Sequence, residues 1–320
     1  VKSGIEFIRK HHLVEQTGGY NWLLKVENAQ ATVLDNTNHC YGFAFVILAY
    51  SWAYRAGVTE AREYLNDTFQ TMETHFWDAK AGLYKDQHNS DFTKCDSYRG
   101  QNANMHTCEA LIAAYEATKD EIFLNRALTL ADNMVNRQAN LMGGLIWEHY
   151  DINWQVDLEY NKDDPKNLFR PWGFQPGHQT EWSKLLMFLN KHKPQKWLIE
   201  RAQALFDNSI NVAWDKKHGG ICYGFAPDKT ICDDDKYFWV QAETLCCAAY
   251  LYQATGDEKY QQWYDKIWQY SWQHLVDHKY GAWFRILTAD NKKIDTMKSP
   301  IGKTDYHTMG ACFDVLELLK

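Results

Sequence analysis

A histidine and a glutamate three residues apart stand at the start of an apolar run, in the stretch 170–182 that opens with Arg170. A Pro-Gly pair precedes the histidine and suits the start of a helix better than its interior. His178 and Glu181 should therefore share one face of the first helical turn, where free N–H groups favour anions and developing oxyanions. A base, a carboxylate and a guanidinium would meet there, unless His178 and Glu181 only cap the helix.

Four further apolar segments begin with polar residues of the same kind. They are Asn38 and His39; Asn102, Asn104 and His106; Trp239, Gln241 and Glu243; and Tyr306 and His307. A lone histidine in such a place is more often a hydrogen-bonded core residue than a functional one. Polar residues on apolar helices are costly unless they hydrogen-bond or line a cavity. We expect their recurrence at equivalent positions of a repeat to mark one shared cavity.

The elements that carry these residues repeat along the chain. Each repeat has a helix, a turn of Gly and aromatic residues, and a second helix, and the turns contain Gly19, Gly82, Gly144, Gly220 and Gly281. Repetition of a supersecondary unit is typical of units arranged around a common core.

The helices of the repeat are of two kinds. Five segments are mostly apolar and predict buried helices, at about 40–57, 104–117, 178–192, 237–254 and 304–319. Five are amphipathic and predict half-exposed helices, at about 3–14, 59–77, 120–138, 195–213 and 257–275. The alternation predicts an all-α fold, an (α/α)6 barrel of inner and outer helices that forms one domain over residues 1–320. Because the first helix is an outer one, we expect the chain to lack the first helical hairpin at its N-terminus.

Composition narrows the class of protein. The 320 residues carry a net charge of −7 with both signs interspersed, which does not favour nucleic acid or a lipid surface as a partner. The apolar runs are too short or interrupted to predict a membrane span. Eight cysteines without regular spacing indicate reduced thiols and a cytoplasmic location. Aromatic residues make up 15% of the chain, and aromatic side chains occur both in large cores and in sugar sites.

Several other chemistries find little support. The sequence has no GxSxG, P-loop or GxGxxG motif and no HExxH pattern, so we expect no nucleotide cofactor and no metal. A metal site made of Glu181, Glu243 and histidines stays open as an alternative. So does a glycoside hydrolase or lyase that uses these two glutamates. A sugar-binding protein without activity is a third alternative.

Four motifs resemble those of the N-acylglucosamine 2-epimerase superfamily, and the resemblance covers essentially all 320 residues. They lie at Arg99–His106, at Pro176–Gly177–His178 through Glu181–Trp182, at Phe238–Glu243, and at Lys303–His307. The Glu-Trp pair and the Asn102/His106 spacing are similar to the branch of mannose and sulfoquinovose isomerases. Epimerases of mannose, cellobiose and N-acylglucosamine belong to the same superfamily.

The resemblance implies an (α/α)6 barrel acting on the open-chain form of a free aldose, without metal or nicotinamide. It implies that His178 and His307 are the paired acid and base. Contacts to the sugar would come from Asn102, His106, Arg170, Glu181 and Trp239, with Trp283 as a further candidate. The expected partner is a small-molecule sugar, and a homodimer is one option for the assembly.

The residue types fit that chemistry. Abstraction of the C2 proton of an aldose gives a cis-enediol, and a histidine with an ordinary pKa near ~6.5 is a suitable base at neutral pH. Glu181 could orient His178 or the substrate hydroxyl that His178 contacts, and donors such as Arg170 and Asn102 could stabilise the developing charge. We expect isomerisation of mannose to fructose, with 2-epimerisation of mannose, glucose or an N-acylglucosamine-type sugar as the alternative outcome.

Overall fold

The computed structural model describes residues 1–167, 169–298 and 305–319. Its elements group into two compact units. Unit 1 comprises Val1–Arg137 and His149–Asp157, and unit 2 comprises Gln138–Glu148 and Leu158–Lys320. The predictions of a single domain and of a missing first hairpin stay predictions. No helix in the described ranges is long and apolar enough to cross a membrane.

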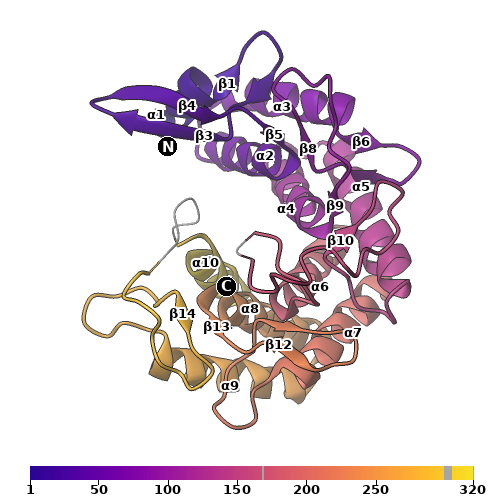
Figure 1. Cartoon of the computed structure of the whole chain (residues 1–320), viewed down its shortest axis with the longest axis vertical. Coiled ribbons are helices and arrows are strands. Elements are labelled where there is room, and N and C mark those ends of the chain that lie inside the picture. Colours follow the sequence, from indigo (N-terminus) through magenta and orange to yellow (C-terminus); the bar gives the residue numbers. More distant parts are fainter. Residues whose placement is uncertain (168, 299–304, 320) are drawn as a thin grey trace. The chain divides into compact units, whose positions relative to one another are not determined.

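Unit 1 contains two inner helices, the half-buried α2 (Cys40–Arg55) and the mostly buried α4 (Gln101–Thr118), which pack against each other (Figure 1). Amphipathic helices cover them: α3 (Ala61–His75) packs on α2, and α5 (Glu121–Ala131) packs on α4. The first helix, α1 (Lys2–Phe7), continues as a π-helix, η1 (Ile8–His12), and α5 continues as η2 (Asp132–Gln138). The sequence ranges of these helices and their inner or outer character are confirmed.

Short antiparallel strand pairs connect the helices of unit 1. The pairs are β1 (Leu13–Val14) with β2 (Gly19–Tyr20), β3 (Leu23–Glu27) with β4 (Gln30–Asp35), β5 (Asn38–His39) with β8 (Gln87–His88), β6 (Trp77–Asp78) with β7 (Leu83–Tyr84), and β9 (Arg99–Gly100) with β10 (His149–Tyr150). The β3–β4 hairpin was not predicted. Its turn places Asn28 and Ala29 at positive φ, the geometry that a two-residue hairpin turn requires.

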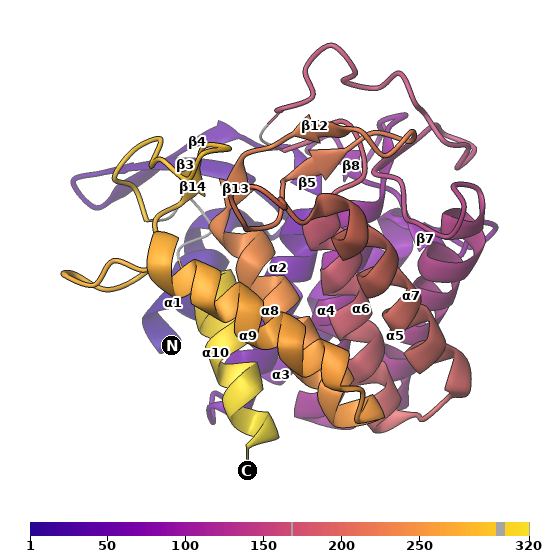
Figure 2. The ribbon, with the colours of Figure 1, turned by 90° about the horizontal axis from the view of Figure 1, so that it is seen from below.

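Unit 2 repeats the arrangement with three inner helices. Helix α8 (Phe238–Thr255) packs between α6 (Pro176–His192) and α10 (Tyr306–Leu318) (Figures 1 and 2). The outer helices α7 (Lys196–Ala213) and α9 (Glu258–His274) pack on α6 and α8.

One prediction of burial is wrong. The segment 304–319 predicts a mostly buried helix, but the apolar residues Met309, Phe313 and Leu316 of α10 are 49%, 62% and 56% exposed. The reason is that α10 packs mainly against α8, which covers one face of it. Thr304, where this helix is predicted to begin, lies outside the described residues, as does Lys303 of the last motif.

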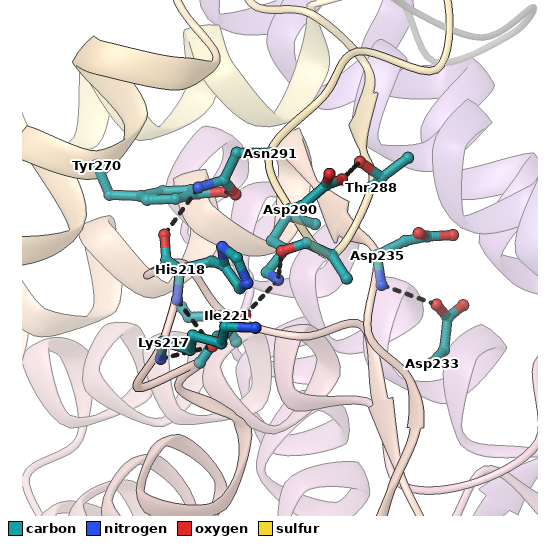
Figure 3. Close-up of polar contacts among 12 residues, drawn as sticks. Lys217, His218, Ile221, Asp233, Asp235, Tyr270, Thr288, Asp290 and Asn291 are labelled. Carbon is teal, nitrogen blue, oxygen red and sulfur yellow. Dashed lines mark hydrogen bonds and ion pairs between the residues drawn. The ribbon is translucent and has the colours of Figure 1, made fainter.

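Four short strands lie in the described loops of unit 2. They are β11 (Gly224–Phe225) paired with β12 (Ile231–Asp233), and β13 (Lys236–Tyr237) paired with β14 (Ile286–Leu287). The Asn291 side chain joins two of these loops to a helix, since its Nδ2 donates to the carbonyl of His218 at 2.7 Å and its Oδ1 accepts from the Tyr270 hydroxyl at 2.8 Å (Figure 3).

An amide side chain fastens each Gly-aromatic turn to the start of an inner helix. The fourth residue of α4, α6 and α8 is Asn104, Gln179 and Gln241, and each is fully buried. Each amide oxygen accepts from a backbone N–H of the turn, and each amide nitrogen donates to the carbonyl of the same residue, which is Tyr84, Ile146 and Ile221 respectively. We call these contacts the amide clamps. They satisfy backbone groups that burial would otherwise leave unpaired.

The clamps correct the reading of the polar helix starts. Asn104 and Gln241 form hydrogen bonds with backbone groups of the turns, and Asn38 likewise accepts from the N–H of Tyr20 at 2.9 Å. The histidines do not occupy equivalent positions, because His106 follows its clamp residue by two and His178 precedes its own by one. The prediction that histidine recurs at one repeat position is therefore wrong.

Candidate functional site

His178 is the third residue of α6, in unit 2, and it is nearly buried, with 8% of its surface exposed. Its Nδ1 lies 3.0 Å from both carboxylate oxygens of Glu148. Glu148 is itself buried and follows the turn that the Gln179 clamp holds at Ile146. A carboxylate facing Nδ1 favours the tautomer with the proton on Nδ1, which leaves Nε2 as the nitrogen able to accept a proton.

His307 is the second residue of α10, and it pairs with a carboxylate in the same way. It is 1% exposed, and its Nδ1 lies 2.7 Å from Oε1 of Glu243 on α8. The other oxygen of Glu243, Oε2, accepts from the ammonium of Lys184 on α6 at 2.5 Å. The contacts from Lys184 to Glu243 and from Glu243 to His307 thus link three inner helices through one buried carboxylate.

The charge state of Glu243 follows from these contacts. Burial by itself would raise the pKa of the carboxyl, because the interior disfavours its charged form. The ammonium of Lys184 and the hydrogen bond with His307 outweigh burial and hold the pKa of Glu243 below its ordinary value. Glu243 is therefore a carboxylate at neutral pH, and both of its oxygens are engaged.

Trp239 brings the two histidines to one surface. Its indole centroid lies 5.1 Å from the ring of His178 and 5.3 Å from the ring of His307, with tilts of 35° and 31°. The indole fits against the backbone of α6 because residue 177 is glycine: a Cβ there would lie 2.4 Å from Cζ3 of the indole. Both predicted acid/base residues therefore contact the same aromatic side chain, which is an apolar surface suited to the C–H face of a sugar.

The structure gives Glu181 a different neighbour from the one we expected. The partner of His178 is Glu148, so the hypothesis that Glu181 orients His178 is wrong. Glu181 is 1% exposed, and one of its oxygens lies within 4.8 Å of an oxygen of Glu243 and a ring nitrogen of His307. These residue types also bind divalent cations, but the Lys184 ammonium already sits on Glu243, and its charge would repel a metal ion.

The other predicted sugar contacts lie as follows. In unit 1, Asn102 is the second residue of α4, and His106 is buried with its Nδ1 3.1 Å from Glu109. In unit 2, Arg170 donates to the hydroxyl of Tyr160 at 2.7 Å. Trp283 is nearly buried and its ring lies 6.4 Å from that of Trp268 on α9. The roles of these residues in holding a sugar stay predictions.

Sequence reasoning missed Glu148 and Lys184. Glu148 directly follows the Gly-aromatic turn at 143–147, and its position after a repeated turn was the only signal for it. Lys184 stands within the apolar run of α6, where a charged residue is rarely buried unless it has a partner. That signal was available in the sequence, although the partner was not.

The chain is similar in sequence and structure to known proteins of one family. The family model of N-acylglucosamine 2-epimerase (GlcNAc 2-epimerase) matches residues 1–311. A D-mannose isomerase from Marinomonas mediterranea is 54% identical over 317 residues, which cover 99% of this chain and 79% of that protein. A crystal structure of D-mannose isomerase superposes with a TM-score of 0.95 at 53% identity and covers 98% of this chain and 80% of the other. The cellobiose 2-epimerase of Bacillus thermoamylovorans shares the fold, with a TM-score of 0.84 at 20% identity over 98% of this chain and 79% of that one. The predicted (α/α)6-barrel fold class is confirmed.

Proposed function

Because the chain belongs to the N-acylglucosamine 2-epimerase family, we propose that it is a sugar isomerase that converts free mannose to fructose. The 54% identity to a D-mannose isomerase supports mannose as the substrate. The observation that carries the proposal is the pair of buried imidazoles, each held at Nδ1 by a glutamate and both in contact with Trp239.

The reaction moves protons without any net change in composition. In open-chain mannose, a base removes the proton from C2 while the aldehyde oxygen O1 takes up a proton, which gives the cis-enediol. The O2 hydroxyl then loses its proton and C1 gains one, so that C2 becomes the carbonyl carbon of fructose. Two groups that each give and take a proton are sufficient for these steps, and an imidazole has a suitable pKa at neutral pH.

We assign these proton transfers to Nε2 of His178 and of His307. With Nδ1 of each ring facing a carboxylate, proton transfer takes place at the opposite nitrogen. Glu148 and Glu243 also stabilise the imidazolium form that appears when the base has accepted its proton. Trp239 would stack on the sugar, and Asn102, His106, Arg170, Glu181 and Trp283 are proposed as further contacts. The mechanism needs no metal or nicotinamide.

A hydrolase mechanism receives less support from the geometry. A glycosidase needs one carboxylic acid that donates a proton and one carboxylate that acts as base or nucleophile. The predicted hydrolase uses Glu243 as one of the two, but its oxygens are bound to Lys184 and His307 and its pKa is lowered. It is therefore poorly placed for either task.

Incubation of the purified protein with free mannose tests the proposal. Formation of fructose is the expected result. Formation of glucose in its place would make the protein a 2-epimerase, and recovery of unchanged mannose would overturn the proposal and leave a hydrolase or a binding protein. We also propose a cytoplasmic location, which the eight unpaired thiols support, and retain a homodimer as a prediction.

A further inference from the structure

Lys184 is a buried lysine that the proposed reaction does not use. Only 4% of its surface is exposed, although it lies in the middle of α6. Removing an ammonium from water is costly unless it is paired at close range, and the partner here is Oε2 of Glu243 at 2.5 Å. A pair of apolar residues could fill the same space without this cost, so the position of Lys184 calls for an explanation in terms of what Glu243 touches.

Glu243 connects the ammonium to His307. One oxygen accepts from Lys184, and the other lies 2.7 Å from Nδ1 of the imidazole. A carboxylate fixed at both oxygens cannot rotate away from the ring, so Lys184 helps to set the orientation of His307. The ammonium also offsets the negative charge of Glu243, which would otherwise favour the protonated form of the imidazole more strongly.

Other titratable groups near Glu243 also affect the protonation of His307. The groups that face it or its neighbours are Glu181 and Lys184 from α6, Asp207 from α7, Cys246 and Cys247 from α8, Tyr264 from α9, and His307, Cys312 and Asp314 from α10. Burial holds both thiols of α8 in the neutral form by raising their pKa values. Among the groups named, Lys184 is the one permanent cation, and two carboxylates lie close to the imidazole.

We propose that Lys184 is a positioning residue of the isomerase: through Glu243 it fixes the tautomer of His307 and limits the basicity of that imidazole. The inference rests on the proposed function for its meaning in catalysis, but the coupling itself is a property of the free protein. Lys184 does not touch the sugar in this account. Its removal should change the protonation of His307 and leave that of His178, which faces Glu148, as it was.

Titration of the histidine rings by NMR measures this coupling directly. The Cε1–H signals of His178 and His307 can be assigned by their loss in single alanine variants. In Lys184→Gln, which retains a group able to donate to Glu243 but loses the charge, the pKa of His307 should rise by about one unit or more. The pKa of His178 should stay the same. The limb of the kcat/KM profile that reports His307 should move in the same direction, with little change in KM.

Two further variants keep the test decisive. Lys236→Met removes another fully buried lysine of unit 2, which binds Asp215 and the carbonyl of Ala289, and it should leave the His307 titration unchanged. The double variant Lys184→Met/Glu243→Gln removes both charges and should lower the pKa of His307 below its value in Lys184→Gln. If Lys184→Gln does not fold, comparison of the double variant with Glu243→Gln alone decides, since loss of the ammonium should raise the pKa of His307 in the double variant.

The possible failures can be told apart. An unchanged or lowered pKa of His307 in folded Lys184→Gln, or an equal shift in both histidines, would overturn the inference. In the comparison of the double variant with Glu243→Gln, an unchanged or lowered pKa of His307 in the double variant would do the same. A protein that shows the predicted shifts but leaves mannose unchanged would contradict the proposed function and leave the coupling intact. Turnover of mannose without the shifts would do the reverse.

Discussion

The two histidine–glutamate pairs of unit 2 are built differently. Glu148 presents both oxygens to Nδ1 of His178 at 3.0 Å, whereas Glu243 gives one oxygen to His307 and the other to Lys184. The first pair lies at the start of α6 and is 8% exposed at its histidine, and the second is almost fully enclosed by α6, α8 and α10. The two imidazoles are thus chemically the same, but the charges around them differ.

This difference suggests that the two histidines have different roles in proton transfer. A reaction that takes a proton at one step and returns it at another works best when its two groups begin in opposite protonation states. A carboxylate devoted to one imidazole favours the protonated ring more than a carboxylate shared with an ammonium does. On this account, the carboxylate of Glu243, which is shared with Lys184, is the weaker partner for an imidazolium.

Loss of either ring should have the largest effect. His178→Ala and His307→Ala should each lower kcat by at least about 10²–10⁴-fold, since positioned proton transfer contributes that much. Initial rates of fructose formation from mannose measure the loss, and circular dichroism serves as the control for folding. Near-normal rates in both variants would remove the proposed acid/base pair.

Neutralising each glutamate should sharpen the comparison. Glu148→Gln should reduce kcat/KM by roughly 10²-fold, because the amide no longer stabilises the imidazolium or selects one tautomer. Glu243→Gln should act on stability as well, because it leaves the Lys184 ammonium buried without its carboxylate. Thermal unfolding and pH–rate profiles of the two variants separate the effects. Equal losses of stability in both would contradict the asymmetry described here.

The contact between Gly177 and Trp239 can be broken with a single methyl group. Gly177→Ala would place a Cβ 2.4 Å from Cζ3 of the indole and push away the surface that both histidines share. We expect a roughly tenfold to hundredfold loss of kcat/KM, as for small displacements in other active sites. Gly310→Ala is the matched control, because a Cβ at that position of α10 meets no atom within 4 Å. Similar losses in the two variants would argue against a specific role for the indole.

Acidification should reduce the stability of the fold by protonating Glu243, the carboxylate of the His307–Glu243 pair. The pKa of its carboxyl is lower in the folded protein than its ordinary value of 4.5, so the carboxylate stabilises the fold above that pH. This contribution is lost as the pH falls from 4.5 toward the folded value. Urea unfolding of the wild type between pH 5 and pH 3 should show a steeper loss of stability than unfolding of Lys184→Met/Glu243→Gln. Parallel curves would show that the pair does not contribute.

Periodicity predicted the helices well, since the mostly apolar segments of the sequence match the ranges of the inner helices α2, α4, α6 and α8 within a few residues. The same pattern predicted the wrong burial for α10, because an apolar helix is buried only where other elements pack against it. His178 and His307 were candidates because they stand at helix starts, and the family resemblance singled them out as the proposed acid and base. Glu148 and Lys184 were missed because a partner far along the chain becomes visible only when the helices are packed.

The NMR spectrum of mannose incubated with the wild-type protein in D₂O tests the central claim most directly, because it reads product and label together. The account predicts fructose that carries solvent deuterium at C1, where an imidazole that has exchanged with solvent returns the proton. Mannose recovered with its C2 proton in place, and without any fructose, would contradict it.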